Sequence, residues 1–292
     1  MSAPLFELKD VSFFYQRQPA LKELSLRIRS GERVVLLGAN GSGKSTLLRL
    51  LDALYFPCSG ELRAFGRSIS ESAMADDETN FAFRKRVGLV FQNPDVQLFN
   101  PTVFDELAFG PLQLGWERQR ILQSIDAVLK RFAIAHLRNR APHRLSGGEK
   151  KRVALASVLI LEPEVLLLDE PTAALDPESQ GEVIRLLIDS RNSGRTIVTA
   201  THDLDIIEDI ADFVFVLADG KLAGTGTPAE ILANHSLLEK SHLLHAHWHV
   251  HSGGAAHCHR HEHGHPHAHG SVSPDTSDAA TSLPLSKSEE QG

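Results

Sequence analysis

The sequence has no stretch that approaches the roughly 20 consecutive apolar residues of a membrane-spanning helix. Its amino terminus shows no basic segment followed by an apolar one, so we expect no signal peptide. The only cysteines, Cys58 and Cys258, show no spacing typical of a disulfide framework, which fits a reducing cytosol. The formal net charge of −7 argues against nucleic acid as the main partner, because phosphate binders usually carry a basic face. A role at a membrane would therefore depend on a protein partner.

The region before Ser241 alternates short apolar segments with helical patterns. Segments that are apolar on both faces predict buried parallel strands, and the helical patterns between them predict an α/β fold with helices flanking the sheet. Residues 213–217 and 221–225 are separated by an Asp-Gly pair, which predicts a hairpin with a tight turn. The predicted parallel strands are residues 33–37, 86–90, 164–168 and 195–199.

A helix-rich stretch from about residue 93 to residue 156 lies between two of these strands, which predicts an inserted helical subdomain. Thr227, Pro228 and Glu230 supply the N-cap, first proline and third-position glutamate of a helix that would close the fold. We therefore predict one folded domain over residues 1–240. Residues 241–292 are rich in His, Gly and Ser and then polar, so we predict a tail that is disordered without a ligand.

A glycine-rich loop directly follows the predicted strand 33–37 and opens a helical pattern over residues 46–54. Its glycines let backbone N–H groups curl around phosphate oxygens, and the helix N-terminus adds its dipole. In this pattern Lys44 reaches the β- and γ-phosphates and Ser45 coordinates Mg²⁺. A chance glycine-rich turn would not combine the Lys-Ser pair with a strand before it and a helix after it. We therefore expect ATP to bind at Gly38, Ala39, Asn40, Gly41, Ser42, Gly43, Lys44, Ser45 and Thr46.

Polar residues follow three of the predicted strands. Asp169 can hold Mg²⁺ through water, and Glu170 is placed to act as the general base for an attacking water. Gln92 and His202 end two other strands, so all four should converge at one edge of the sheet, where open α/β sheets bind ligands. His202 could contact the γ-phosphate or hold the water. The alternatives are a carboxylate helix cap and a buried structural histidine.

Residues 144–152, Arg-Leu-Ser-Gly-Gly-Glu-Lys-Lys-Arg, open a helical pattern that continues to Ile160. Ser146 and Glu149 predict a capping box. A helix N-terminus with two glycines is also an anion site, and both interpretations can hold together.

Over residues 4–235 these motifs resemble the ABC ATPase family. Residues 145–149 resemble its signature, residues 170–176 its Walker B extension and D-loop, and Gln92 and His202 its Q-loop and H-loop. Tyr15 falls where the family stacks an aromatic ring on adenine. The resemblance implies a P-loop NTPase core of RecA-like type, an antiparallel β subdomain and an inserted α-helical subdomain. It also implies that Gln92 serves the catalytic site and its Mg²⁺.

The same resemblance implies a head-to-tail dimer with two composite ATP sites. In each site, Ser146, Gly147 and Gly148 of one subunit face the γ-phosphate bound by the loop of the other, and Asp176 of the D-loop belongs to the same site. The usual signature ends in Gln where this chain has Glu149, which puts only that side chain's own contact in doubt.

Residues 90–99, 101–111 and 146–156 are similar to the energy-coupling-factor ATPases, which energise uptake of vitamins or of nickel and cobalt. The similarity implies a peripheral position on the cytoplasmic face of the cell membrane. It also implies a transmembrane coupling subunit, substrate-binding membrane subunits and a second ATPase subunit, taken as an identical copy. Residues 92–111 form the groove that receives coupling helices in that family.

Twelve of the sixteen histidines lie between His242 and His269, many of them as His-x-His. Neutral imidazole is a good ligand for Ni²⁺, Co²⁺, Cu²⁺ and Zn²⁺, and a flexible tract can wrap several ions. A solvated linker is the alternative, and the irregular spacing argues against a purification tag. The candidate ligands for Ni²⁺, Co²⁺ or Zn²⁺ are His245, His247, His249, His251, His257, Cys258, His259, His261, His263, His265, His267 and His269.

The sequence favours the ATPase subunit of a nickel or cobalt importer. A zinc or vitamin importer ATPase, and a metal-storage protein that acts through its tail, remain alternatives. A soluble ABC ATPase of repair or translation would usually carry two nucleotide domains or a long coiled-coil insertion, and the sequence has neither.

Overall fold

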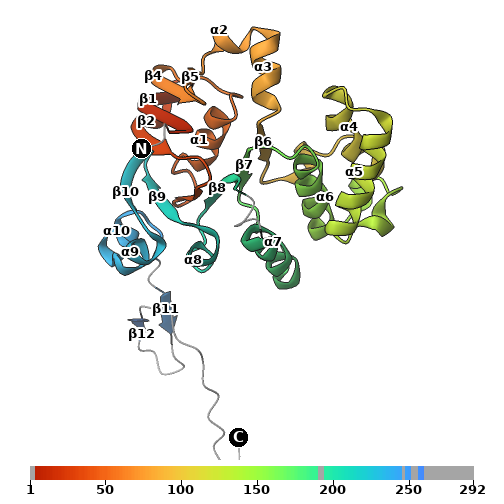
Figure 1. Cartoon of the computed structure of the whole chain (residues 1–292). Helices are drawn as coiled ribbons and strands as arrows, with labels where there is room; N and C mark the ends of the chain where they lie inside the picture. The colour runs from red at the N-terminus through yellow and green to blue at the C-terminus, as the bar shows by residue number, and fades with distance from the viewer. Residues whose placement is uncertain (1–3, 190–193, 245–246, 251–255, 260–292) are drawn as a thin grey trace, which may run out of the picture.

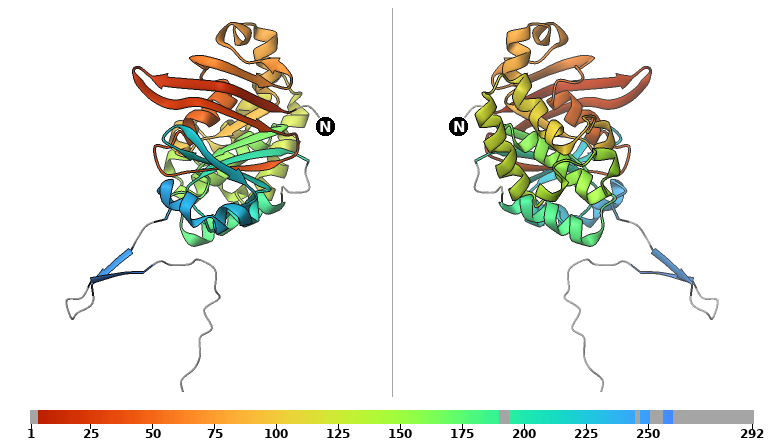
Figure 2. Two further views of the ribbon diagram at one scale, coloured as in Figure 1. Left: turned by 90° about the vertical axis from the view of Figure 1, so that its left-hand side faces the viewer. Right: turned by 90° about the vertical axis from the view of Figure 1, so that its right-hand side faces the viewer.

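The computed structural model describes residues 4–189, 194–244, 247–250 and 256–259. Two sheets stack in the body, and a group of helices lies to one side of them (Figures 1 and 2). The predicted α/β class is confirmed.

The central sheet has six strands in the order β10-β9-β3-β8-β7-β6. Strands β9, β3, β8, β7 and β6 each pair in parallel with their neighbours in this order. The four predicted parallel strands are therefore confirmed. The predicted hairpin is confirmed as well, because β9 and β10 pair antiparallel around Asp219 and Gly220, which both have positive φ as a tight primed turn requires. The strands are β3 Arg33–Leu37, β6 Val87–Val90, β7 Val165–Asp169, β8 Thr196–Thr201, β9 Phe213–Ala218 and β10 Lys221–Gly226.

A second, antiparallel sheet in the order β2-β1-β4-β5 packs over the central sheet, with helix α1 (Lys44–Leu51) between them. Alternate residues of β3 divide between two hydrophobic cores, since Val34 and Leu36 join the core shared with α1 while Val35 and Leu37 join the core on the helical side. Burial on both faces explains the continuous apolar run of this strand. The strands of the second sheet are β1 Phe6–Tyr15, β2 Gln18–Ile28, β4 Ser59–Ala64 and β5 Arg67–Ser68.

The helices between β6 and β7 form the group at the right of Figure 1. They are η1 Pro94–Val96, α4 Val103–Gln113, α5 Arg118–Arg131, η2 Ala135–Leu137, η3 Pro142–Arg144 and α6 Gly147–Leu159, which occupy the region predicted as an inserted helical subdomain. The remaining helices are α2 Glu71–Met74, α3 Asp77–Arg84, α7 Pro177–Asp189, α8 Ile207–Ile210, α9 Pro228–Ala233 and α10 His235–Lys240. Helix α9 begins with the predicted capping box of Thr227 and Glu230.

The packed body continues slightly past residue 240. Ser241 is buried, and Leu243 and Leu244 pack against the larger core. Beyond them, β11 (His247–Val250) and β12 (Ala256–His259) pair antiparallel, whereas the rest of the predicted disordered tail lies outside the described residues. In the described part of the chain, no helix combines the length and the apolar character needed to cross a membrane.

Candidate active site

The predicted phosphate loop joins β3 to α1 and is built from close backbone contacts. A Cβ atom added at Gly38 would lie 2.5 Å from the Leu217 carbonyl oxygen, so this position accepts no side chain. Gly43 has φ of 105° and precedes the first turn of α1, a conformation that favours glycine. Ser42 Oγ is buried without a hydrogen-bond partner in the described structure. The loop and Tyr15 line a cavity of about 290 Å³, which provides room for a ligand against the N-terminus of α1.

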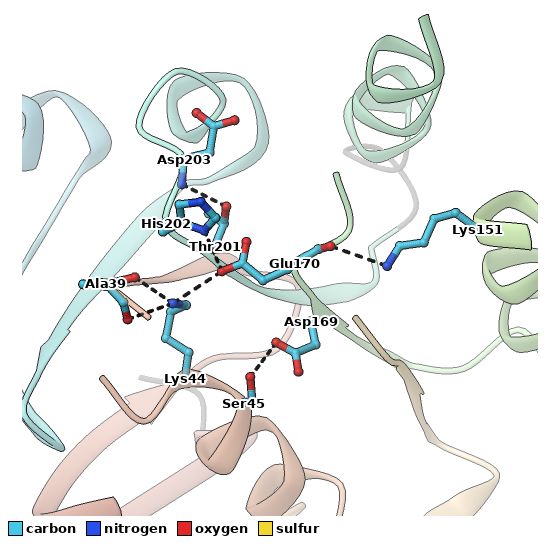
Figure 3. A network of polar contacts seen from close by, with 10 residues as sticks. Ala39, Lys44, Ser45, Lys151, Asp169, Glu170, Thr201, His202 and Asp203 are labelled. Carbon is cyan, nitrogen blue, oxygen red and sulfur yellow. Dashed lines mark hydrogen bonds and ion pairs between the residues drawn. The ribbon is translucent and has the colours of Figure 1, made fainter. Parts of the chain in front are cut away.

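Lys44 folds back over this loop, although it is almost fully buried. Its Nζ atom donates to the carbonyl oxygens of Gly38 at 2.6 Å and Ala39 at 3.2 Å, and lies 3.4 Å from Glu170 Oε1 (Figure 3). A buried ammonium group held by carbonyl oxygens at a phosphate loop is positioned to transfer its hydrogen bonds to phosphate oxygens. Lys44 thus has the surroundings that its predicted role requires.

The donor set for Mg²⁺ is present at the start of α1. Ser45 Oγ donates to Asp169 Oδ1 at 2.9 Å, so a hydroxyl and a carboxylate oxygen lie side by side. Burial raises the pKa of Asp169, an effect opposed by the Ser45 hydrogen bond and by the nearby Arg49 and Lys44. Oxygen ligands of this kind fit Mg²⁺, and the ion's charge would favour the ionised carboxylate. The two residues therefore fit the predicted magnesium site.

Glu170 follows Asp169 directly in the chain and is also buried. Its Oε1 atom is 3.0 Å from His202 Nδ1, so the ends of β7 and β8 bring the two predicted catalytic residues into hydrogen-bonding contact (Figure 3). Glu170 has φ of 44°, which is uncommon for a residue with a side chain, and its backbone N–H donates to Ala200 O at 2.9 Å. The backbone turn after Asp169 thus points the carboxylate toward Lys44 and His202.

Tyr15 lies at the end of β1 and lines the same cavity as the loop. Its hydroxyl shares a hydrogen bond with Thr46 Oγ1 at 3.2 Å and accepts one from Arg49 Nη1 at 3.3 Å. Its ring packs edge-on against Phe13 and Tyr55 and remains 40% exposed. These contacts fix the position of the ring, and its exposed area is available for the predicted stacking on a base.

The signature residues begin α6 with a complete capping box. Glu149 N donates to Ser146 Oγ at 3.3 Å, and Ser146 N donates to Glu149 Oε2 at 2.7 Å, which holds the pKa of Glu149 below its usual range. A Cβ at Gly148 would lie 2.3 Å from Ser179 Oγ, so α6 approaches the start of α7 closely at this glycine. Asp176 caps that helix by accepting from Ser179 N and Ser179 Oγ. The capping-box prediction is confirmed.

Gln92 lies with the signature rather than with the phosphate loop in this structure. It is exposed and lines a second cavity, of about 320 Å³, together with Gly147, Lys150 and Ala173. The predicted convergence is therefore seen for Asp169, Glu170 and His202, whereas Gln92 stands at the neighbouring cavity.

Lys151 was given no role by sequence reasoning, yet it is one of the most buried side chains of the protein, at 1% exposure. Its Nζ atom donates to Phe91 O and Gln92 O, both at 3.1 Å, and to Glu170 O at 3.4 Å. Burial lowers its pKa to about 8, against the attraction of Asp169 and Glu170. The sequence signal for this burial is helical spacing, because Gly148, Lys151, Leu155 and Leu159 lie three or four residues apart and share the buried side of α6.

The histidine-rich tail lies largely outside the described residues, including His245, His251, His261, His263, His265, His267 and His269. Strands β11 and β12 pair His247 with His259, Trp248 with Cys258, and His249 with His257. Among the residues the structure describes, no three His, Cys, Asp or Glu side chains gather into a metal site.

The family model of the ABC transporter matches residues 21–173, and this chain belongs to that family. Among curated relatives, it is 57% identical over 244 residues to the nickel import ATP-binding protein NikO of Rhodobacter capsulatus, covering 82% of this chain and 96% of that protein. It is 42% identical over 240 residues to the energy-coupling factor transporter ATP-binding protein EcfA of Methanothermobacter thermautotrophicus, covering 82% and 76%.

Two solved structures have the same fold. The structure of cbiO1 from Clostridium perfringens, part of the ABC transporter complex cbiONQ, superposes with a TM-score of 0.70 at 36% identity and covers 83% of this chain and 96% of that one. A dimeric ATP-binding cassette in a post-hydrolysis state, bound to ADP and phosphate, gives a TM-score of 0.69 at 28% identity, covering 76% and 98%.

Proposed function

We propose that this chain is the ATP-hydrolysing subunit of an energy-coupling-factor importer for nickel or cobalt ions. The geometric observation that carries the ATPase part is the contact of buried Glu170 with both Lys44, at 3.4 Å, and His202, at 3.0 Å, beside the phosphate loop. The cargo rests on the 57% identity to NikO, which extends over 96% of that protein.

In the proposed reaction, the loop N–H groups and Lys44 bind the phosphates of ATP. Lys44 would exchange its carbonyl contacts for phosphate oxygens, and this exchange would release Glu170 to face the attacking water. Glu170 takes a proton from that water as its oxygen attacks the γ-phosphorus, and the bond to the β-phosphate oxygen breaks, leaving ADP and phosphate. His202 orients Glu170 and the water. Ser45, and Asp169 through water, would hold a Mg²⁺ ion that neutralises charge on the phosphates.

The second half of the site comes from another subunit in this proposal. Ser146 caps α6 on the helical subdomain, and the cavity beside it also contacts Gln92 and Ala173, so both the signature and the D-loop border a surface separate from the phosphate loop. A head-to-tail homodimer would place Ser146, Gly147, Gly148 and Asp176 of one subunit against the nucleotide of the other. The dimeric state of the relative with bound ADP and phosphate supports this arrangement.

The proposed contact with the membrane subunits is the surface after β6. Val96 and Phe99 are 66% and 67% exposed, Leu112 is 59% exposed, and Phe99 packs edge-on against Phe109. Exposed apolar side chains grouped in this way are typical of protein interaction sites. They would receive the coupling helices and keep the chain on the cytoplasmic face of the membrane.

The tail histidines would bind Ni²⁺, Co²⁺ or Zn²⁺ in an accessory role. Because Leu243 and Leu244 pack on the core, the matched truncation ends after Leu244. We expect the truncated protein to keep its melting temperature and ATPase rate and to lose most of its capacity for Ni²⁺ in isothermal titration. Unchanged Ni²⁺ capacity would contradict the tail assignment, and loss of ATPase activity would contradict its accessory role.

Uptake in cells that express this chain with its membrane subunits tests the proposed cargo. Accumulation of Ni²⁺ or Co²⁺ should depend on the wild-type chain and be lost with Glu170→Gln. Dependence of Zn²⁺ or vitamin uptake alone on the wild-type chain would contradict the nickel or cobalt assignment while leaving the ATPase intact.

A further inference from the structure

We propose that Lys151 is a positioning residue that couples the signature helix α6 to the first residues of the Q-loop and to the general base Glu170. This inference rests on the proposed ATPase function. Lys151 does not contact ATP in this proposal. The supporting observations are the hydrogen bonds of Lys151 and the burial of its side chain.

The first observation is that one ammonium group joins three segments. Lys151 Nζ donates to Phe91 O and Gln92 O, both at 3.1 Å, and these two carbonyl groups lie just after β6. It also donates to Glu170 O at 3.4 Å, which lies just after β7 (Figure 3). The side chain is 1% exposed, so its charge is largely removed from bulk water. A buried charge is costly unless hydrogen bonds satisfy it, and backbone carbonyl oxygens do so here.

The second observation is that α6 holds the same part of the Q-loop by an independent route. Phe91 N donates to Gln97 Oε1 at 3.2 Å, and Gln97 Nε2 donates to Ala154 O at 2.9 Å and Ser157 Oγ at 3.1 Å, both on α6. The N–H and C=O groups of Phe91 are therefore both connected to the signature helix. Among the hydrogen bonds of the described residues, that of Lys151 extends this connection to Glu170.

These hydrogen bonds would transmit a movement of α6 to the Q-loop and to Glu170. A displacement of α6 relative to the sheet changes the three Lys151 contacts together, so it shifts the backbone of the general base as well as the Q-loop. The backbone of Glu170 is already in the left-handed region, at φ of 44°, and needs such neighbours to hold it. Movement of the membrane-facing helices would in this way reach the water-activating carboxylate within one subunit.

Three variants test this coupling. Lys151→Met keeps the length and removes all donors, Lys151→Gln keeps a shorter donor, and Lys130→Met is a matched control because Lys130 is an exposed lysine of α5. For each variant we would measure the thermal unfolding temperature, the ATP dissociation constant, and kcat and KM for ATP hydrolysis. The wild-type assay comes first, because absence of any hydrolysis there would contradict the proposed function rather than the role of Lys151.

We expect Lys151→Met to lower kcat by about 10-fold to 100-fold with ATP affinity within 2-fold of wild type, because the phosphate loop is untouched. Lys151→Gln should lose less kcat than Lys151→Met, and Lys130→Met should match wild type.

A kcat within 2-fold of wild type in folded Lys151→Met would overturn the proposal. So would a parallel loss of kcat, ATP affinity and unfolding temperature, which indicates a structural role alone. If Lys151→Met does not fold, Lys151→Gln decides: lower kcat with unchanged ATP affinity supports positioning, and unchanged kcat contradicts it.

Discussion

Helices α1 and α6 both begin in glycine-rich sequence, but their first turns are satisfied in different ways. At α1, Gly43 precedes the helix with φ of 105°, and no side chain forms a hydrogen-bonded cap there. At α6, Ser146 and Glu149 complete a capping box. Free N–H groups at a helix start bind anions, so α1 is built to hold phosphate within one subunit. At α6 the capping box takes up the N–H groups of Ser146 and Glu149, and in the proposed dimer a second subunit brings the phosphate to Ser146, Gly147 and Gly148.

Glu170→Gln should give the largest effect. It sharpens the comparison of α1 with α6 because it separates ATP binding from ATP hydrolysis. The amide cannot accept the proton of the attacking water, so we expect turnover to fall by about 100-fold or more. ATP binding should persist, because Lys44 and the α1 side of the site are unchanged. Phosphate release and equilibrium ATP binding would be measured together, with Glu71→Gln as the control because Glu71 is an exposed residue of α2. Substantial remaining turnover would remove Glu170 from the role of general base.

Lys44→Ala and Ser146→Ala form the direct test of the two helix starts. Loss of the buried ammonium group should weaken ATP binding to dilute protein by about 10-fold to 100-fold, the size of a lost charge-assisted hydrogen bond. Ser146→Ala should leave that affinity unchanged, lower the stability by about 1 kcal/mol through loss of a cap, and reduce turnover. Fluorescence titration with a nucleotide analogue at low protein concentration would measure the affinities. Equal losses of affinity in both variants would break the comparison.

Tyr15 extends the α1 side of the site to the nucleotide base. Tyr15→Ala should weaken ATP binding about 10-fold, because base stacking on an aromatic side chain contributes about 1–3 kcal/mol. Tyr15→Phe should retain most of the affinity, although it loses the hydroxyl contacts with Thr46 and Arg49. Calorimetric titration with ATP and with inorganic triphosphate separates stacking from phosphate binding. Equal weakening for both ligands would contradict the stacking role.

Asp52, at the C-terminal end of α1, should give the smallest effect, seen in stability. Burial raises its pKa from 3.8 to about 7, against the hydrogen bond and charge of Arg84. The folded state therefore binds more protons than the unfolded state between these values. The contribution of Asp52 to stability is complete below about pH 4 and is lost as pH rises to about 7. The slope should be on the order of 1 kcal/mol per pH unit. Urea unfolding from pH 5 to 8 should show that slope reduced in Asp52→Asn, and an identical slope in both proteins would contradict the assignment.

Local sequence patterns were enough to predict the β3 loop, Asp169, Glu170 and the capping box of Ser146, because strands and helix starts carry their own signals. The surroundings of Lys151 could not be predicted, since its acceptors come from segments about 20 and 60 residues away along the chain. The position of Gln92 at the signature cavity depends on how the helical subdomain packs, which strand ends alone do not specify. The packing of Leu243 and Leu244 on the core could not be predicted either, because these residues lie at the start of a tail of polar composition.

The dimer that closes over ATP is the central claim, and sedimentation of the Glu170→Gln protein tests it most directly. With MgATP, the protein should sediment as a dimer at micromolar concentration, and without nucleotide it should sediment as a monomer. Adding Ser146→Arg to the same protein should abolish the dimer by placing a bulky side chain at the phosphate-facing edge of α6. A Glu170→Gln protein that stays monomeric with MgATP, both alone and beside its membrane subunits, would contradict the account.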